Sequence, residues 1–181
     1  MHKYYYIKKA VSEKDCDNFL DEHKNSEFKN ATVVGSSEEE DKQYRQAKVR
    51  WIDGNELIVR VVWSYILEMN RHFKLHLDGY EQVQLTKYDQ DNFYKWHQDS
   101  GDTTGPLARR KLSAVLQLSK PEDYEGCELQ LFNGDIDVEK LPIINQGSLI
   151  IFRSTEWHRV TQLTKGIRYS LVFWATGSPL V

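Results

Sequence analysis

The sequence predicts a mainly β protein with helices at its front, arranged as an antiparallel barrel or jelly roll rather than a parallel sheet. Two observations carry this prediction. Apolar residues recur at helical spacing before residue 81 and alternate with a period of two after it. The alternating segments are also short, and turn residues separate them. We expect a single domain over residues 1–181, with a helical front over 1–80 and a β core over about 81–177.

The first helix is expected within residues 11–26, where Ser12 precedes Asp15 by three positions in a pattern close to a capping box. The acidic stretch that follows, residues 36–43, is expected to be a solvated loop; an acidic binding tail is the alternative.

A second, longer helix is expected over residues 53–73, with Asp53 or Asn55 as its cap and a wide apolar face. Both helices are expected to pack on the outer face of one sheet.

The strands of the core are expected where apolar and polar residues alternate between turns, over residues 82–88, 111–119, 127–132, 147–152 and 168–175. A further strand is expected within residues 136–144, ending at Pro142.

The composition is that of an ordinary globular protein, with 40% apolar and 28% charged residues in 181. A net charge of −3 and a pI near 6.1 give no reason to expect nucleic acid as a partner. No apolar run is long enough for a membrane span, and the N-terminus lacks a signal-peptide pattern. Cys16 and Cys127 have no metal-type spacing. We expect a reduced, cytoplasmic protein, either a monomer or a weak dimer.

His97 and Asp99 stand two residues apart at the end of an alternating segment. Side chains at i and i+2 of a strand lie on one face, about 6.5 Å apart, so both can reach one metal ion. Taken alone, this pair is more often a surface or hydrogen-bonded pair. His158, which follows a strongly apolar strand, completes the two histidines and one carboxylate of a non-haem Fe(II) centre. Zinc could use the same residues, but no hydrolytic base is obvious nearby.

Arg168 lies ten residues after His158, at the start of the next strand. If that strand pairs with the one near His158, the guanidinium points into the same barrel mouth. A buried guanidinium needs a partner, and a ligand carboxylate meets it with two charge-assisted hydrogen bonds. A structural salt bridge is the alternative. Ser170 faces the same way as Arg168 and could share that carboxylate.

The order His97, Asp99, His158, Arg168 resembles the Fe(II)- and 2-oxoglutarate-dependent dioxygenases, in the prolyl 4-hydroxylase and PKHD-type branch. The matching stretches are residues 87–99, 109–132 and 147–177.

The resemblance implies a double-stranded β-helix, a cupin-like jelly roll, in which the three residues bind iron at the catalytic centre. It implies that Arg168 binds the distal carboxylate of 2-oxoglutarate and that Tyr88 lies near this cosubstrate. Gln117 stands where some prolyl hydroxylases use a tyrosine; its amide could donate the same bond. Trp174 stands at an aromatic position of the family, and Cys127 replaces a glycine.

The function that the resemblance implies is hydroxylation of an unactivated C–H bond with Fe(II), 2-oxoglutarate and O2, releasing succinate and CO2, with ascorbate as reductant. The expected substrate is a prolyl residue in a peptide or protein. The alternatives are the same chemistry on a free amino acid or small metabolite, a non-catalytic cupin-type metal-binding domain, and a nucleic-acid demethylase, which the acidic balance disfavours.

Two segments are expected to grip the substrate: residues 100–110, which contain two glycines, and the segment Arg45–Trp51. Trp96 and Trp157 directly precede the two histidines and are expected to pack beneath them.

Overall fold

The computed structural model describes residues 3–32, 43–100, 106–132, 138–140 and 145–178, and it contains two long helices and fourteen strands within them. In chain order these elements are β1 (Tyr4–Ile7), α1 (Glu13–His23), β2 (Lys29–Asn30), β3 (Arg45–Gln46), β4 (Lys48–Ile52), α3 (Leu57–Phe73), β5 (Gly79–Tyr80), β6 (Val83–Asp89), β7 (Phe93–His97), β8 (Arg110–Gln117), β9 (Tyr124–Gly126), β10 (Leu129–Phe132), β11 (Val138–Lys140), β12 (Leu149–Arg153), β13 (His158–Val160) and β14 (Leu163–Thr176).

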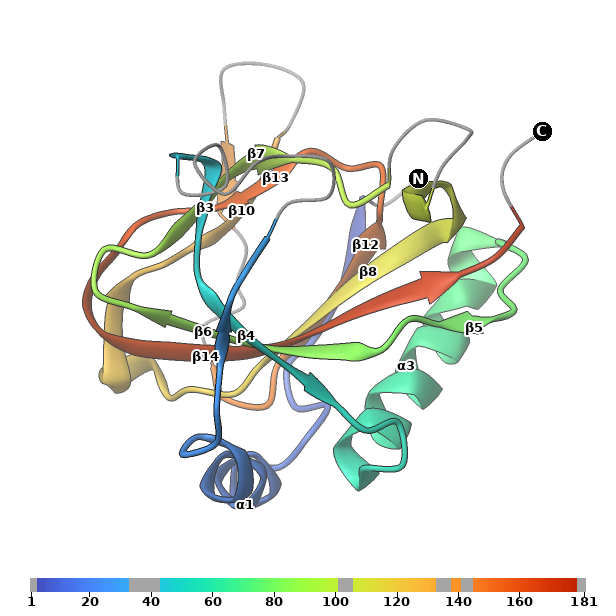
Figure 1. The fold of residues 1–181 in the computed structure, drawn as a ribbon. Coiled ribbons are helices and arrows are strands. Elements are labelled where there is room, and N and C mark those ends of the chain that lie inside the picture. Colours follow the sequence, from blue (N-terminus) through green and yellow to red (C-terminus); the bar gives the residue numbers. More distant parts are fainter. Residues whose placement is uncertain (1–2, 33–42, 101–105, 133–137, 141–144, 179–181) are drawn as a thin grey trace.

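The strands form two antiparallel sheets, as expected of a jelly roll (Figure 1). The larger sheet has nine strands in the order β1-β12-β8-β14-β6-β4-β2, and both β5 and β9 pair with β14. The smaller sheet has the order β11-β10-β13-β7-β3. Most neighbours in the two sheets come from distant parts of the sequence, so the fold brings β7 and β13 side by side although about 60 residues separate them.

The two helices begin in different ways. Ser12 is the N-cap of α1, as predicted, and its hydroxyl accepts a hydrogen bond from the Asp15 amide at 3.1 Å. The predicted cap of α3 is wrong: Glu56 holds the N-cap position and makes no side-chain cap bond. The Asp53 carboxylate instead accepts a hydrogen bond from the Asn55 amide at 2.8 Å, which forms a turn before the helix.

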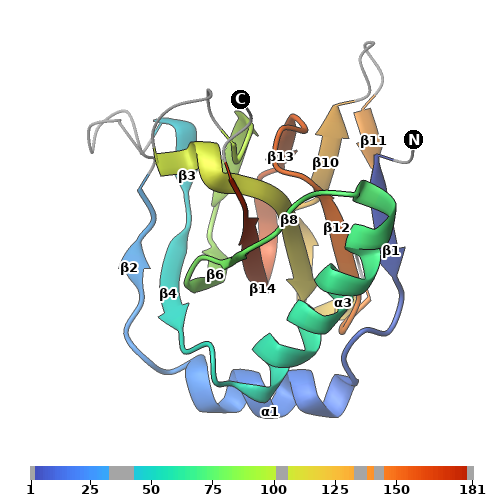
Figure 2. The same ribbon diagram turned by 90° about the vertical axis from the view of Figure 1, so that its right-hand side faces the viewer.

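Both helices cover the outer face of the larger sheet, as the sequence predicts (Figure 2). Phe19 of α1 and Ile66 of α3 belong to one buried cluster with alternate residues of β8, which are Leu112, Ala114 and Leu116. Because this apolar layer is buried against the helices, this face of the larger sheet points away from the smaller sheet.

The opposite face of the larger sheet packs on the smaller one. Val115 and Phe152 of the larger sheet and Leu131 and Val160 of the smaller sheet share a second buried cluster. Val115 lies between two residues of the helix-facing layer because successive strand side chains point to opposite faces. Every second residue of each strand therefore lines the space between the two sheets, and the polar site lies in that space.

All six predicted core strands overlap observed ones; β11 covers only three residues of the predicted segment 136–144. The front of the chain also contributes five short strands that the sequence analysis did not predict, β1 to β5. They extend both sheets: β1 pairs with β12, and β3 pairs with β7. The acidic segment 36–43 falls almost wholly outside the described residues. Among the described residues, none of the helices has the length and apolar character that crossing a membrane requires.

Candidate active site

Three side chains of the predicted metal centre meet between the two sheets. His97 ends β7, His158 begins β13, and the two residues lie opposite each other in the antiparallel register. Asp99 follows β7 by two residues, and its backbone amide donates to the Ser154 carbonyl at 2.9 Å. The three residues are 5–8% exposed. The pairing of β7 with β13 and the hydrogen bond between Asp99 and Ser154 thus hold all three residues in place.

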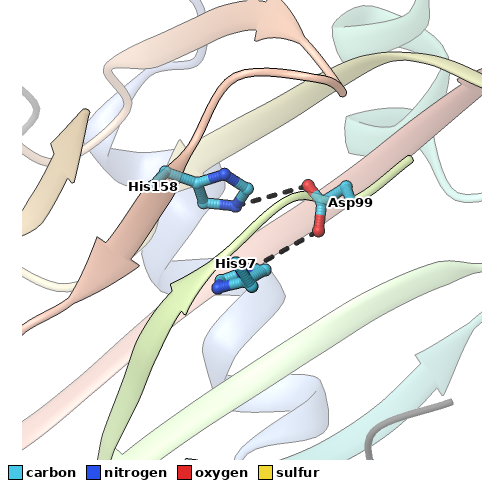
Figure 3. A group of neighbouring side chains, drawn as sticks. All are labelled: His97, Asp99 and His158. Carbon is cyan, nitrogen blue, oxygen red and sulfur yellow. Dashed lines mark ion pairs between the residues drawn. The ribbon is translucent and has the colours of Figure 1, made fainter. Parts of the chain in front are cut away.

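Their ligand atoms converge (Figure 3). One Asp99 carboxylate oxygen lies 3.6 Å from His97 Nε2, and the other lies 3.4 Å from His158 Nε2. All three ligand atoms lie within 4.8 Å of one another, a spacing that one ion can bridge.

The hydrogen bonds of the two imidazoles fix which nitrogen carries the proton. His97 Nδ1 lies 2.8 Å from the Lys95 carbonyl oxygen, and His158 Nδ1 lies 2.9 Å from the Glu156 carbonyl oxygen. A carbonyl oxygen only accepts, so each Nδ1 must donate its hydrogen. In the neutral imidazoles, each Nε2 then presents its lone pair toward the common centre, which is the tautomer that a metal requires.

The charges of the cluster suit a cation. Burial alone would raise the pKa of Asp99, but the imidazoles of His158 and His97 and the hydroxyl of Ser113 hold it well below its usual range. Burial lowers the pKa of His158 to about 4, so its ring is neutral at pH 7. Two imidazoles and one carboxylate are the donor set of non-haem Fe(II) sites, so the residues present fit that ion.

Arg168 lies in the same pocket, on the inward face of β14. It is 2% exposed. Its strand does not pair with the one near His158, which was the condition considered for this arginine. Arg168 pairs with Tyr88 of β6, and from Ser170 onward β14 also pairs with β8, so the guanidinium reaches the pocket from the opposite sheet. Its Nε donates to Gln117 Oε1 at 3.0 Å, and Nη1 lies 3.9 Å from Cys127 Sγ. Within the described part of the chain, no carboxylate pairs with it.

The other predicted cosubstrate residues lie around Arg168. Tyr88 and Ser170 line the pocket, and the Arg168 guanidinium carbon lies 5.7 Å from the centre of the Tyr88 ring. Gln117 is fully buried behind Arg168, and its amide nitrogen donates to the Ser119 carbonyl and to the Tyr124 hydroxyl. In this structure Gln117 therefore orients the guanidinium, and its contact with the cosubstrate stays a prediction.

Ser113 is a site residue that the sequence analysis missed. Its hydroxyl donates to Asp99 Oδ2 at 2.6 Å and lies 3.0 Å from the Ser154 hydroxyl. The signal was available in the alternation of β8, since Ser113 has the same parity as Val115 and Gln117, which also point away from the helices.

Tyr94 and Arg110 make contacts near the centre that the sequence analysis did not specify. The Tyr94 ring stacks on the His97 ring, with centres 3.5 Å apart and planes at 15°. Arg110 binds both carboxylate oxygens of Glu81 and stacks over the Trp174 ring at 3.9 Å. Arg110 was placed in a substrate-gripping loop, of which residues 101–105 lie outside the described residues.

The prediction that Trp96 and Trp157 pack beneath the histidines is wrong. Trp157 is 47% exposed. Trp96 contacts Phe132 edge-on at 5.9 Å between ring centres, and Arg159 stacks over it at 4.8 Å. Neighbouring side chains of a strand alternate, so a residue next to an inward-pointing histidine points outward.

Comparison with known proteins identifies relatives of the β core. The family model of the 2OG-Fe(II) oxygenase superfamily matches residues 83–176. A PKHD-type hydroxylase of Xylella fastidiosa (strain M23) is 35% identical over 100 residues, which cover 50% of this chain and 42% of that protein. A PKHD-type hydroxylase of Synechococcus sp. (strain JA-2-3B'a(2-13)) is 42% identical over 69 residues, or 38% of this chain and 30% of that protein. The match thus spans less than half the length of each relative.

Solved structures extend the likeness to almost the whole chain. A Pseudomonas putida prolyl-4-hydroxylase superposes with a TM-score of 0.77 at 21% identity, over 97% of this chain and 93% of that one. A prolyl hydroxylase from Trichoplax adhaerens, in complex with a peptide fragment of the hypoxia-inducible-factor oxygen degradation domain, gives 0.76 at 17% identity, over 96% and 83%. At these identities the likeness concerns the fold, and it confirms the predicted double-stranded β-helix.

Proposed function

The chain belongs to the 2OG-Fe(II) oxygenase superfamily, and on this premise we propose that it is a dioxygenase that hydroxylates an unactivated C–H bond with Fe(II), 2-oxoglutarate and O2. One observation carries the proposal. A buried His-Asp-His centre shares a pocket with a buried arginine that has no carboxylate partner among the described residues. A metal and a keto-diacid together satisfy both features.

The site residues have two roles, metal binding and cosubstrate binding. His97, Asp99 and His158 hold Fe(II) through two nitrogens and a carboxylate. Arg168 binds the distal carboxylate of 2-oxoglutarate, with Tyr88 beside it, because a ligand carboxylate supplies the charge that the buried guanidinium lacks. When bound, iron and cosubstrate supply the oxidative decarboxylation that yields succinate, CO2 and the hydroxylated product. The metal-binding side chains are only 5–8% exposed, so the packed sheets shield this chemistry from bulk water.

The substrate that we propose is a prolyl residue of a peptide or protein. The sequence relatives are PKHD-type hydroxylases, and two of the similar folds belong to prolyl hydroxylases, one of them solved with a peptide. Ascorbate as the reductant and a cytoplasmic location are parts of the same proposal, drawn from the family likeness and from the composition.

The proposal is tested by following succinate formation with Fe(II), 2-oxoglutarate and O2 across a library of blocked proline-containing peptides and a panel of free amino acids. Mass spectrometry with isotopically labelled dioxygen locates the inserted oxygen atom. We expect peptide-dependent succinate and one labelled oxygen on a prolyl ring. Turnover with free amino acids only would refute the peptide substrate, and absence of 2-oxoglutarate turnover under every condition would refute the dioxygenase.

A further inference from the structure

A second guanidinium lies in the active-site pocket. Arg45 of β3 is 9% exposed and lines the same pocket as the His-Asp-His centre. It pairs in register with Tyr94 of β7, and its guanidinium carbon lies 4.6 Å from the centre of the Tyr94 ring. The Tyr94 ring in turn stacks on His97. Arg45 lies before the segment that the family model matches, residues 83–176, so it is a contribution of the front of this chain.

The hydrogen-bonding capacity of Arg45 is only partly used. Its Nη1 donates to the Thr32 carbonyl oxygen at 3.3 Å. Its Nε is buried and has no hydrogen-bond partner within the described part of the chain. A buried donor left without an acceptor is destabilising, so such a group is typically satisfied by a ligand or water.

Trp174 provides an independent second donor. Its side chain lines the same pocket, is 6% exposed, and its Nε1 has no partner among the described residues. An indole N–H can only donate. Arg110 stacks over the ring and is itself held by both oxygens of Glu81, so the indole is fixed in place. The pocket thus presents two buried N–H groups, besides Arg168, that require acceptor oxygens.

The cosubstrate of the proposed function leaves these two donors unused. A keto-diacid has two acidic ends; Arg168 meets the distal carboxylate, and the keto-acid end belongs at the metal centre. We propose that Arg45 and Trp174 bind an acceptor oxygen of the primary substrate and so orient it in the pocket. The acceptor is either a backbone carbonyl of a peptide or the carboxylate of a free amino acid. This inference rests on the proposed function and assigns the substrate-binding donors of its site.

The test compares three variants with the wild type: Arg45→Gln, Trp174→Phe, and the control Arg60→Gln, which removes a charge from the exposed face of α3. Trp174→Phe keeps an aromatic ring and deletes the N–H, so it tests the inference even if the Arg45 variant fails to fold. The probes are N-acetylated, C-amidated peptides with a central proline, and free L-proline. The Michaelis constant is measured for each probe, and 2-oxoglutarate affinity by anaerobic titration with Fe(II).

We expect Arg45→Gln to raise the Michaelis constant of the productive probe about 10- to 150-fold, the loss of one charge-assisted hydrogen bond. Trp174→Phe should raise it about 2- to 10-fold. Both variants should bind 2-oxoglutarate as the control does. The probe that responds identifies the acceptor as carbonyl or carboxylate.

Three results would overturn the inference: unchanged Michaelis constants, an equal loss of 2-oxoglutarate affinity, or a wild type that binds Fe(II) and 2-oxoglutarate but turns over neither probe. A wild type that binds neither Fe(II) nor 2-oxoglutarate would instead refute the proposed function, and the inference with it.

Discussion

Replacing Ser113 by alanine should weaken metal binding although Ser113 is no ligand. Its hydroxyl is fully buried and donates to Asp99 Oδ2 at 2.6 Å, the oxygen that faces His158. A hydrogen bond to a charged group contributes about 1.5–3 kcal/mol, and residues that orient metal ligands typically change metal affinity by about 10- to 100-fold. We therefore expect the dissociation constant for Fe(II) to rise about 10- to 100-fold.

The matched control is Ser154→Ala. Both serines are fully buried and lose the same hydroxyl, and their oxygens lie 3.0 Å apart. The Ser154 hydroxyl makes no hydrogen bond to Asp99 within the described residues, whereas its backbone carbonyl, which survives the substitution, accepts a hydrogen bond from the Asp99 amide. Ser154→Ala should therefore lose only a neutral hydrogen bond, and its metal affinity should fall by less than about tenfold.

The assay is anaerobic Fe(II) titration of both variants and the wild type, with thermal unfolding of the metal-free proteins measured in parallel. Equal affinities in Ser113→Ala and the wild type would show that the Ser113 hydroxyl does not support metal binding. So would equal losses in the two variants, because the effect would then come from the buried cavity rather than from the carboxylate.

Two further predictions concern charge. Arg168→Gln should raise the dissociation constant of 2-oxoglutarate about 10- to 150-fold, since the charge-assisted bonds to the distal carboxylate are lost. Titration of Arg60→Gln is the control. An unchanged dissociation constant in Arg168→Gln would show that Arg168 has only a structural role. For the metal-free protein, the pKa of His158 is about 4 when folded against 6.5 as the ordinary value, so the unfolded chain binds more protons between these limits. The contribution of His158 to the free energy of unfolding is therefore fully present above pH 6.5. It is lost as the pH drops toward 4, by about 1–2 kcal/mol at pH 5. Urea unfolding at pH 7 and 5 measures this, and a loss of the same size in His158→Gln would contradict the assignment.

The part of the site that local sequence order determines was predictable. His97 ends β7 and Asp99 follows two residues later, and His158 and Arg168 come after them at spacings that resemble the family. The core strands were predictable for the same reason, because alternation of apolar residues is a local property.

The contacts that the sequence did not identify depend on pairing between distant segments: Ser113 was missed, and Arg45 was expected only as part of the substrate-binding segment Arg45–Trp51. Ser113 reaches Asp99 only because β8 lies beneath the turn after β7, and Arg45 reaches Tyr94 only because β3 joins the smaller sheet. No local sequence pattern predicts either pairing. In particular, β3 is only two residues long, and a single sequence does not define the partner of so short a strand. The role of Trp174 depends on a donor without an acceptor, which only a structure shows.

The proposed function requires that His97, Asp99 and His158 bind a single iron ion beside a bound keto-diacid. Anaerobic addition of Fe(II) and 2-oxoglutarate, followed by the visible metal-to-ligand charge-transfer band, measures this binding. We expect a band that saturates at one iron per wild-type chain and is absent from an Asp99→Ala variant with an unchanged circular dichroism spectrum. A folded wild-type protein without the band, or an Asp99→Ala variant that shows it at full intensity, would show that these residues do not form the iron site.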